Sequence, residues 1–170
     1  MAFTVTINPR LRVPTIWTAQ NNQVNALNTI ALIKMRTMRG VSSKGAKFKK
    51  YSTKKIYISL KGARLKPKGG RLSRTGKSMY FEGGYREYKK KSRLGNIQTA
   101  EVDLTLSGVL MNSIQVKSST ATSYTIGLAR QGLPYGQYVN QKRPFMGLLK
   151  KEQEIIVKAA AKDMKRNLKS

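Results

Sequence analysis

Apolar residues recur at three- and four-residue steps in two segments, one near each end of the chain. The first runs from about Thr18 to Met38 and contains Val24, Leu27, Ile30, Ala31, Met35 and Met38. The second runs from Leu148 to Leu168 and contains Ile156, Ala160, Met164 and Leu168, with Ile155 and Ala159 beside them. Side chains at this spacing share one face of a helix. The pattern therefore predicts two amphipathic helices, and Gly40 is a stop signal just after the first.

Alternation of apolar and polar residues predicts several short strands. Phe3 to Ile7 alternates until Asn8-Pro9 interrupts it, and Ile56, Ile58 and Leu60 alternate with polar or aromatic neighbours. Two further segments, 115–119 and 123–129, are separated by a few small polar residues and are typical of a hairpin.

Between these segments the patterns are shorter. Leu106, Leu110 and Ile114 fit one face of a short helix capped by Thr105 or Ser107. The stretch "YGQYVNQ" near residue 138 fits a helical turn, whereas 62–79 is a Gly-, Pro- and Ser-rich loop. We expect an α+β fold in which a small mixed or antiparallel sheet packs against an N-terminal and a C-terminal helix, with long basic loops. Residues 1–17 form an N-terminal strand and arm, and 18–170 a single domain with a loop insertion at about 62–79.

The charge changes this picture most. The 170 residues include 34 Lys and Arg against 7 Asp and Glu, a net charge of +27. Lys34 to Arg93 alone holds 21 Lys and Arg and two acidic residues, a net charge of +19. Such a surface attracts polyanions, so nucleic acid or an acidic protein surface is the expected partner. No apolar run approaches the roughly 20 residues of a membrane-spanning helix, and the first residues lack the pattern of a secretory signal. We expect a cytoplasmic origin and no membrane partner.

Candidate catalytic chemistry is sparse, because the chain has neither His nor Cys. Glu82 and Glu87 stand among cations, where a solvated ion-pair role is the stronger interpretation. Glu152 and Glu154 fall in the first turn of the last predicted helix, where the helix dipole favours acidic side chains. The stretch "GGRLSRTGKS" ends like a phosphate-binding loop, but five residues rather than four separate Gly70 from Gly76. We therefore expect no enzyme activity, no cofactor and no metal.

Basic segments interleaved with aromatic residues are the remaining candidates. In "GYREYKKKSR", residues 84–93, two tyrosines alternate with cations, and a second group of lysines flanks Phe48 and Tyr51. Aromatic rings stack on bases and cations neutralise phosphates, so this chemistry permits nucleic-acid binding. The candidate contacts to DNA or to an acidic partner are Lys49, Lys50, Lys54, Lys55, Arg86, Lys89, Lys90, Lys91 and Arg93.

The order of several short motifs is similar to that of one protein family. The motifs are "RTMRGVSSKGAKFKKYS", "EGGYREYKKKSRLG", "VDLTLSGVLMNSI", "YTIGL", "YGQYVNQ" and "RPFMGL", followed by a terminal helix. From about residue 24 to the end, this order resembles the tail-completion and virion-morphogenesis proteins of tailed bacteriophages, which include head-tail joining and neck proteins. Residues 1–17 have no counterpart in the pattern, and 62–79 looks like an insertion.

The resemblance implies a structural role. Such a protein forms a ring, commonly a hexamer, at the head-tail junction of the virion, where it joins or closes the tail and lets DNA pass through its lumen. Its partners are further copies of itself, neighbouring connector and tail proteins and, transiently, DNA without sequence preference. The expected interface residues are Tyr85, Tyr88, Tyr138, Arg143 and Phe145, although Phe145 is also placed to enter the core. The alternative from a different class is a basic nucleic-acid-binding protein of ribosomal or nucleoid type.

Overall fold

The computed structural model describes residues 2–5, 17–61, 68–91, 98–130 and 133–168. The helices in these ranges are α1 (Ala19–Met38), α2 (Gly84–Lys91), α3 (Val109–Asn112), α4 (Leu133–Lys142) and α5 (Lys150–Asn167). The strands are β1 (Ala2–Val5), β2 (Ile56–Ser59), β3 (Arg71–Leu72), β4 (Ser78–Phe81), β5 (Ile114–Ser119) and β6 (Tyr124–Leu128). The expected α+β class, with an N-terminal and a C-terminal helix packed against a sheet, is confirmed.

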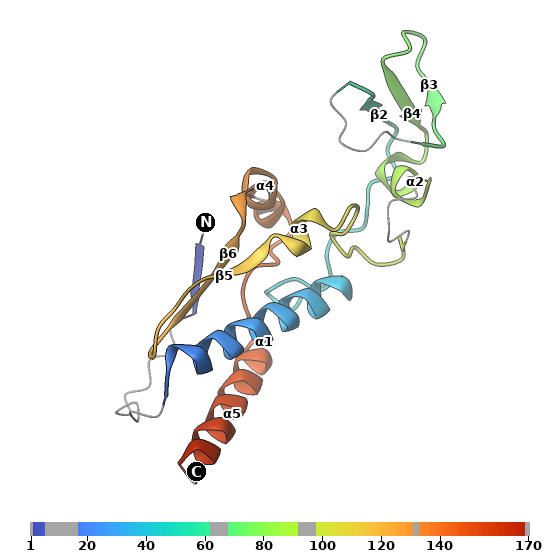
Figure 1. The fold of residues 1–170 in the computed structure, drawn as a ribbon. Helices are drawn as coiled ribbons and strands as arrows, with labels where there is room; N and C mark the ends of the chain where they lie inside the picture. Colours follow the sequence, from blue (N-terminus) through green and yellow to red (C-terminus); the bar gives the residue numbers. More distant parts are fainter. Residues whose placement is uncertain (1, 6–16, 62–67, 92–97, 131–132, 169–170) are drawn as a thin grey trace.

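The strands form two antiparallel sheets at different places in the molecule. One sheet has the order β1-β6-β5 and the other the order β2-β4-β3. We call the first sheet with α1, α3, α4, α5 and the described segments that connect them the body. The described residues from 52 to 91 are the basic arm. Figure 1 shows the basic arm projecting from one end of the body. In this view α1 and α5 lie below the β5-β6 strands.

The core of the body lies between α1, the β6-β5 strands and the segment that precedes α5. Ile33, Tyr124, Ile126 and Phe145 are all completely buried there. The placement of Phe145 in the core agrees with its apolar character and contradicts its assignment to an interface, since it has no exposed surface to offer a partner. The hairpin of β5 and β6 is where the sequence predicted it.

Helix α1 has the predicted bounds, but the face that it buries is the opposite of the predicted one. Val24, Leu27, Met35 and Met38 are each about half exposed, with exposed fractions of 47% to 55%. The inward face carries small apolar residues mixed with polar ones: Asn22, Asn25, Ala26, Thr29, Ile30, Ile33, Arg36 and Thr37. Of the predicted apolar stripe, only Ile30 is buried.

Several side chains of the buried polar face of α1 find partners in the body, although Asn25 Nδ2 and Thr37 Oγ1 have none among the described residues. Asn22 donates from Nδ2 to the carbonyl of Thr120 at 2.8 Å, and the Thr29 hydroxyl lies 2.8 Å from that of Tyr124. Arg36 forms a buried ion pair with Glu152 of α5 and donates to the carbonyls of Phe145 and Gly147 at 2.6 and 2.9 Å. Hydrogen bonding offsets the free-energy cost of removing these polar groups from water. A pattern of apolar residues gives no sign of such hydrogen bonds, so it could not predict this buried face.

Three further local predictions are corrected. The segment 62–79 was expected to be loop throughout, but within its described part β3 and the start of β4 pair as a hairpin. Residues 84–91 form α2, which the sequence did not predict as a helix because it is polar almost throughout. Helix α3 is capped by Gly108 at φ 78° rather than by Thr105 or Ser107. Among the described residues, none of the helices is both long and apolar enough to cross a membrane.

Candidate functional site: a tyrosine-lined pocket where the basic arm meets the body

A buried ionic cluster joins the basic arm to the body. Lys89 of α2 is 1% exposed and pairs through Nζ with Oδ1 of Asp103, which is equally buried. The hydroxyl of Tyr51 donates to the same Oδ1 at 3.0 Å and accepts from Lys89 at 3.2 Å. Because Lys89 is enclosed, its prediction as a DNA contact is wrong. Asp103 also accepts from the Thr105 amide at 3.0 Å, and its carboxylate neutralises Lys89.

Tyr88 also belongs to the interior of the basic arm. It is 6% exposed, and its ring lies 5.3 Å from that of Phe81, which comes from β4. The prediction of Tyr88 as an interface residue is therefore wrong, because α2 turns it toward the β2-β4-β3 sheet. Tyr85 lies one turn earlier on α2 and faces the body, where its ring is 5.3 Å from that of Tyr51.

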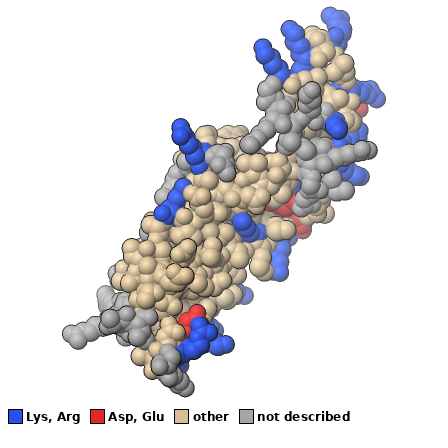
Figure 2. Space-filling view, in the orientation of Figure 1, with Lys and Arg blue, Asp and Glu red and all other residues tan. Residues whose placement is uncertain are grey.

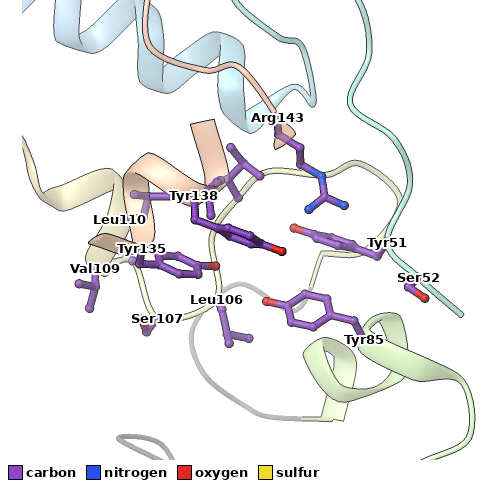
Figure 3. Close-up of a pocket in the computed structure, with 13 residues that line it drawn as sticks. Tyr51, Ser52, Tyr85, Leu106, Ser107, Val109, Leu110, Tyr135, Tyr138 and Arg143 are labelled. Atoms are coloured by element: carbon purple, nitrogen blue, oxygen red, sulfur yellow. The ribbon is translucent and has the colours of Figure 1, made fainter. Parts of the chain in front are cut away.

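Beside this cluster lies a pocket of about 580 Å³. Figure 3 shows the phenol groups of four tyrosines and the guanidinium of Arg143 converging in it. The basic arm supplies Tyr85 and Ser52, α4 supplies two further tyrosines, and the segment before α3 forms an apolar wall. The lining residues are Tyr51, Ser52, Tyr85, Leu104, Leu106, Ser107, Gly108, Val109, Leu110, Tyr135, Tyr138, Val139 and Arg143.

Two glycines allow the elements around the pocket to come this close. A Cβ at Gly136 would lie 2.2 Å from Cδ1 of Leu128, so a side chain at residue 136 would have to displace that of Leu128 for α4 to rest on β6 as it does. That contact places Tyr135 and Tyr138, on either side of Gly136, at the pocket. Gly84, at φ 66°, begins α2 where a Cβ would lie 2.6 Å from the Ser52 carbonyl. At Gly84 the positive φ and the close backbone together require glycine, whereas at Gly136 the close atoms belong to side chains.

Arg143 lies at the boundary between the body and the segment leading to the arm. It donates from Nη2 to the carbonyl of Lys49 at 3.3 Å, and its Cζ is 5.7 Å from the centre of the Tyr51 ring. Its Nε is buried and has no hydrogen-bond partner among the described residues. The guanidinium is therefore held in place while part of its donor capacity is unused.

Burial raises the pKa of three of the phenols in the pocket, those of Tyr51, Tyr85 and Tyr135. Burial raises the pKa of the Tyr51 hydroxyl well above its ordinary value, and the nearby Asp103 carboxylate raises it further. Burial likewise raises the pKa of Tyr85, with smaller contributions from Tyr135 and Tyr88. At neutral pH these groups are therefore neutral hydrogen-bond donors and acceptors, and Arg143 is the charged group in the lining.

Most of the predicted basic contacts are exposed. Lys49, Lys50, Lys54 and Lys55 lie on the segment that leads into β2, and Arg86, Lys90 and Lys91 lie on α2. Figure 2 shows Lys and Arg side chains gathered over the end of the molecule where Figure 1 places β2, β3, β4 and α2, whereas the middle of that face carries few. Arg93 is outside the described residues. The structure brings these cations into one region, and their contact with DNA or an acidic partner stays a prediction.

The acidic candidates show no catalytic arrangement in the described part of the chain. Glu87 accepts from the Gly83 amide at 2.7 Å and pairs with Lys91, and Glu82 is exposed at the end of β4. Within those residues no group of three or more His, Cys, Asp or Glu side chains is placed to hold a metal ion. The stretch that ends like a phosphate-binding loop forms the β3-β4 hairpin and does not precede a helix, as such a loop requires.

The sequence named some pocket residues and missed others. Tyr85, Tyr138 and Arg143 were predicted together as interface residues, and the structure places all three in the pocket lining. Tyr135 was missed, although its spacing of three from Tyr138 on a helical turn would have placed both on one face. No family model, curated protein or solved structure matches the chain.

Proposed function

We propose that this protein is a structural component of the head-tail junction of a tailed virus, where copies of the chain form a ring that joins or closes the tail and surrounds the passing DNA. The order of motifs from about residue 24 to the end supports this proposal. The structural observation that carries it is the outward face of α1, where apolar side chains are exposed in a strongly basic protein and no charged residue occurs from Ala19 to Ile33.

The outward face of α1 is suited to contact another copy. Its members, which we call the α1 stripe, are Val24, Leu27, Ala31, Met35 and Met38. No charged residue occurs between Ala19 and Ile33. Two chains of charge +27 repel each other at most orientations, and the repulsion is weakest where uncharged surfaces approach. Burying the exposed part of one such side chain contributes on the order of 1 kcal/mol.

A ring requires that this stripe meet a different surface of the next copy. Contacts between two different patches generate a closed ring when the rotation from one copy to the next divides a full turn evenly. Self-complementary patches give dimers instead. Ionic screening and polyanions both weaken the repulsion between copies. Assembly is therefore expected to increase with salt concentration or in the presence of DNA.

The basic arm supplies the second part of the proposal. Its exposed cations project from the body, so in a ring they face either the DNA or the acidic surface of an adjacent ring. Attraction of this kind is independent of sequence and is weakened by salt. The chain then holds DNA by electrostatic attraction and performs no chemistry on it.

The test is quantitative mass spectrometry of purified particles of the virus whose genome encodes the chain. The copy number of this chain is compared with that of the portal protein in the same particles. A ratio that corresponds to one ring per particle supports the proposal and directs imaging to the neck. Absence from the particles, with recovery in ribosomal or nucleoid fractions, contradicts it and favours the basic nucleic-acid-binding protein.

A further inference from the structure

The pocket between the basic arm and the body has unused hydrogen-bonding capacity. The hydroxyls of Tyr85, Tyr135 and Tyr138 make no hydrogen bond to any other described residue, and neither does the buried Nε of Arg143. The three hydroxyls and the end of the Arg143 guanidinium converge on the same space in Figure 3, whereas the Nε atom is enclosed behind it. The walls between them are largely apolar and come from Leu106, Val109 and Leu110. A ligand that suits this space has a flat or apolar part and an anionic part.

We propose that the pocket binds one unstacked nucleotide of a single-stranded nucleic acid. The base lies against the Tyr135 and Tyr138 rings, which are 58% and 61% exposed, and its phosphate accepts hydrogen bonds from Arg143 and the phenols. Stacking on aromatic rings combined with a cationic groove is how single strands are bound without strong sequence preference. A pocket of about 580 Å³ lies within the range of small-molecule sites and accommodates one nucleotide.

The chemistry of the lining favours a nucleotide over an acidic peptide. The residues that line the pocket include no Asp or Glu, and its one charged group is Arg143. A phosphodiester offers only acceptors, which match the guanidinium and the phenol O–H groups. A peptide also brings backbone N–H donors, which would be left without strong acceptors in this lining. Lys49 and Lys50 precede Tyr51 directly and are exposed, so cations flank the pocket along the chain.

A duplex does not fit the same description. Its bases are stacked and paired, so a base enters a pocket only after the duplex opens, which costs a few kcal/mol. The pocket is therefore a site for single strands, whereas the basic arm attracts any polyanion. This binding site is inferred from the pocket geometry and does not depend on the proposed ring. Failure of one leaves the other intact, because particle copy number and oligonucleotide affinity are independent measurements.

The experiment uses fluorescence anisotropy with the full chain and a labelled oligothymidylate of about twelve nucleotides, at several salt concentrations. A duplex of equal length and an oligouridylate are the parallel probes. Comparison of the oligouridylate with the oligothymidylate shows whether the protein prefers RNA or DNA. The variants are Tyr138→Ala and the double substitution Lys49→Gln with Lys50→Gln. The matched control is Tyr57→Ala, which removes a tyrosine that is 64% exposed on β2 and outside the pocket. Circular dichroism checks that each variant is folded.

We expect the single strand to bind more tightly than the duplex. Tyr138→Ala weakens single-strand binding about tenfold, consistent with the loss of one stacked base, and leaves the dependence of affinity on salt unchanged. Tyr57→Ala retains the parent affinity. Lys49→Gln combined with Lys50→Gln instead reduces the slope of log affinity against log salt, by about 0.7 for each phosphate that is no longer neutralised.

Three results would overturn the proposal. One is equal affinity for the single strand and the duplex, because surface charge alone would then account for the binding. A second is an equal effect of Tyr138→Ala and Tyr57→Ala. The third is displacement of the oligonucleotide by poly-glutamate of equal charge, with poly-glutamate affinity reduced to the same extent by Tyr138→Ala; this outcome assigns the pocket to an acidic protein partner.

Discussion

The body and the basic arm are stabilised in different ways. In the body, side chains from α1, α3, α4, β5 and β6 share one apolar cluster, to which Arg36 and Glu152 add a buried ion pair. In the basic arm, β4 pairs briefly with β2 and with β3, and Phe81 and Tyr88 are its buried apolar side chains. Its attachment rests on Lys89, Tyr51 and the Tyr85 ring. The comparison indicates that the body unfolds as a unit, whereas the arm can loosen separately.

The largest expected effect is on the body. Arg36→Met removes a cation that pairs with Glu152 and donates to two carbonyls between α4 and α5. The carboxylate is then left buried without its partner, which typically costs about 3–5 kcal/mol. Urea denaturation monitored by circular dichroism should show a lower free energy of unfolding for the whole chain. The control is Arg39→Met, an exposed cation less than one turn away, which should change stability little. Equal effects of the two substitutions would contradict a special role for the buried pair.

The second prediction separates the arm from the body. Lys89→Met removes the cation that neutralises Asp103, at a cost of about 3 kcal/mol, and loosens the attachment of α2. Hydrogen exchange measured by mass spectrometry should show faster exchange across β2, β4 and α2, with protection of α1 and β6 retained. Lys90→Met is the matched control, because Lys90 is the adjacent exposed residue of α2. Loss of protection throughout the body would show that arm and body form one cooperative unit.

The same contrast explains how far the sequence could predict the structure. The existence of both long helices, the β5-β6 hairpin and the α+β class followed from the periodicity of their apolar residues. In the basic arm, α2 was missed because its one strongly buried cation, Lys89, looks like any other lysine in a basic run. Only the partner Asp103, 14 residues away, distinguishes it, and a contact at that separation has no periodic signature.

Helix α1 shows a second limit of periodicity. Its apolar residues predicted the helix correctly but predicted the wrong inward face, because hydrogen-bonded Asn and Thr side chains occupy the core side. The sequence predicted part of the candidate pocket, since Tyr85, Tyr138 and Arg143 were named. Their convergence depends on contacts of Gly84 and Gly136 with distant backbone and side chains. Such close approaches are set by tertiary packing.

The third prediction concerns association rather than folding. Leu27→Glu places a charge within the α1 stripe, where Leu27 is 55% exposed. The isolated chain should keep its stability, and self-association should weaken more than tenfold, because a carboxylate would be buried at the contact. Light scattering coupled to size exclusion, over a range of protein and salt concentrations, measures this effect. Gln23→Glu adds the same charge at an exposed position outside the stripe and should leave association intact. Equal weakening by both variants would exclude the stripe as the contact.

The smallest expected effect lies within the arm. Glu87 pairs with Lys91 and accepts from the Gly83 amide, and these contacts, in that order, hold its pKa below the ordinary value. A carboxyl group whose pKa is lower in the folded state stabilises the fold above its unfolded pKa, and this contribution disappears as the pH falls through its folded pKa. Glu87→Gln should therefore cost about 0.5 kcal/mol at pH 7, a small amount because the pair is partly exposed, and this cost should shrink as the pH falls through the folded-state pKa of Glu87. Hydrogen exchange of α2 over a series of pH values below 7 measures the change locally, with Glu82→Gln as the exposed control. If Glu87→Gln slowed the exchange of α2 at neutral pH, the pair would not stabilise the helix, and the arm would depend on its buried contacts with the body alone.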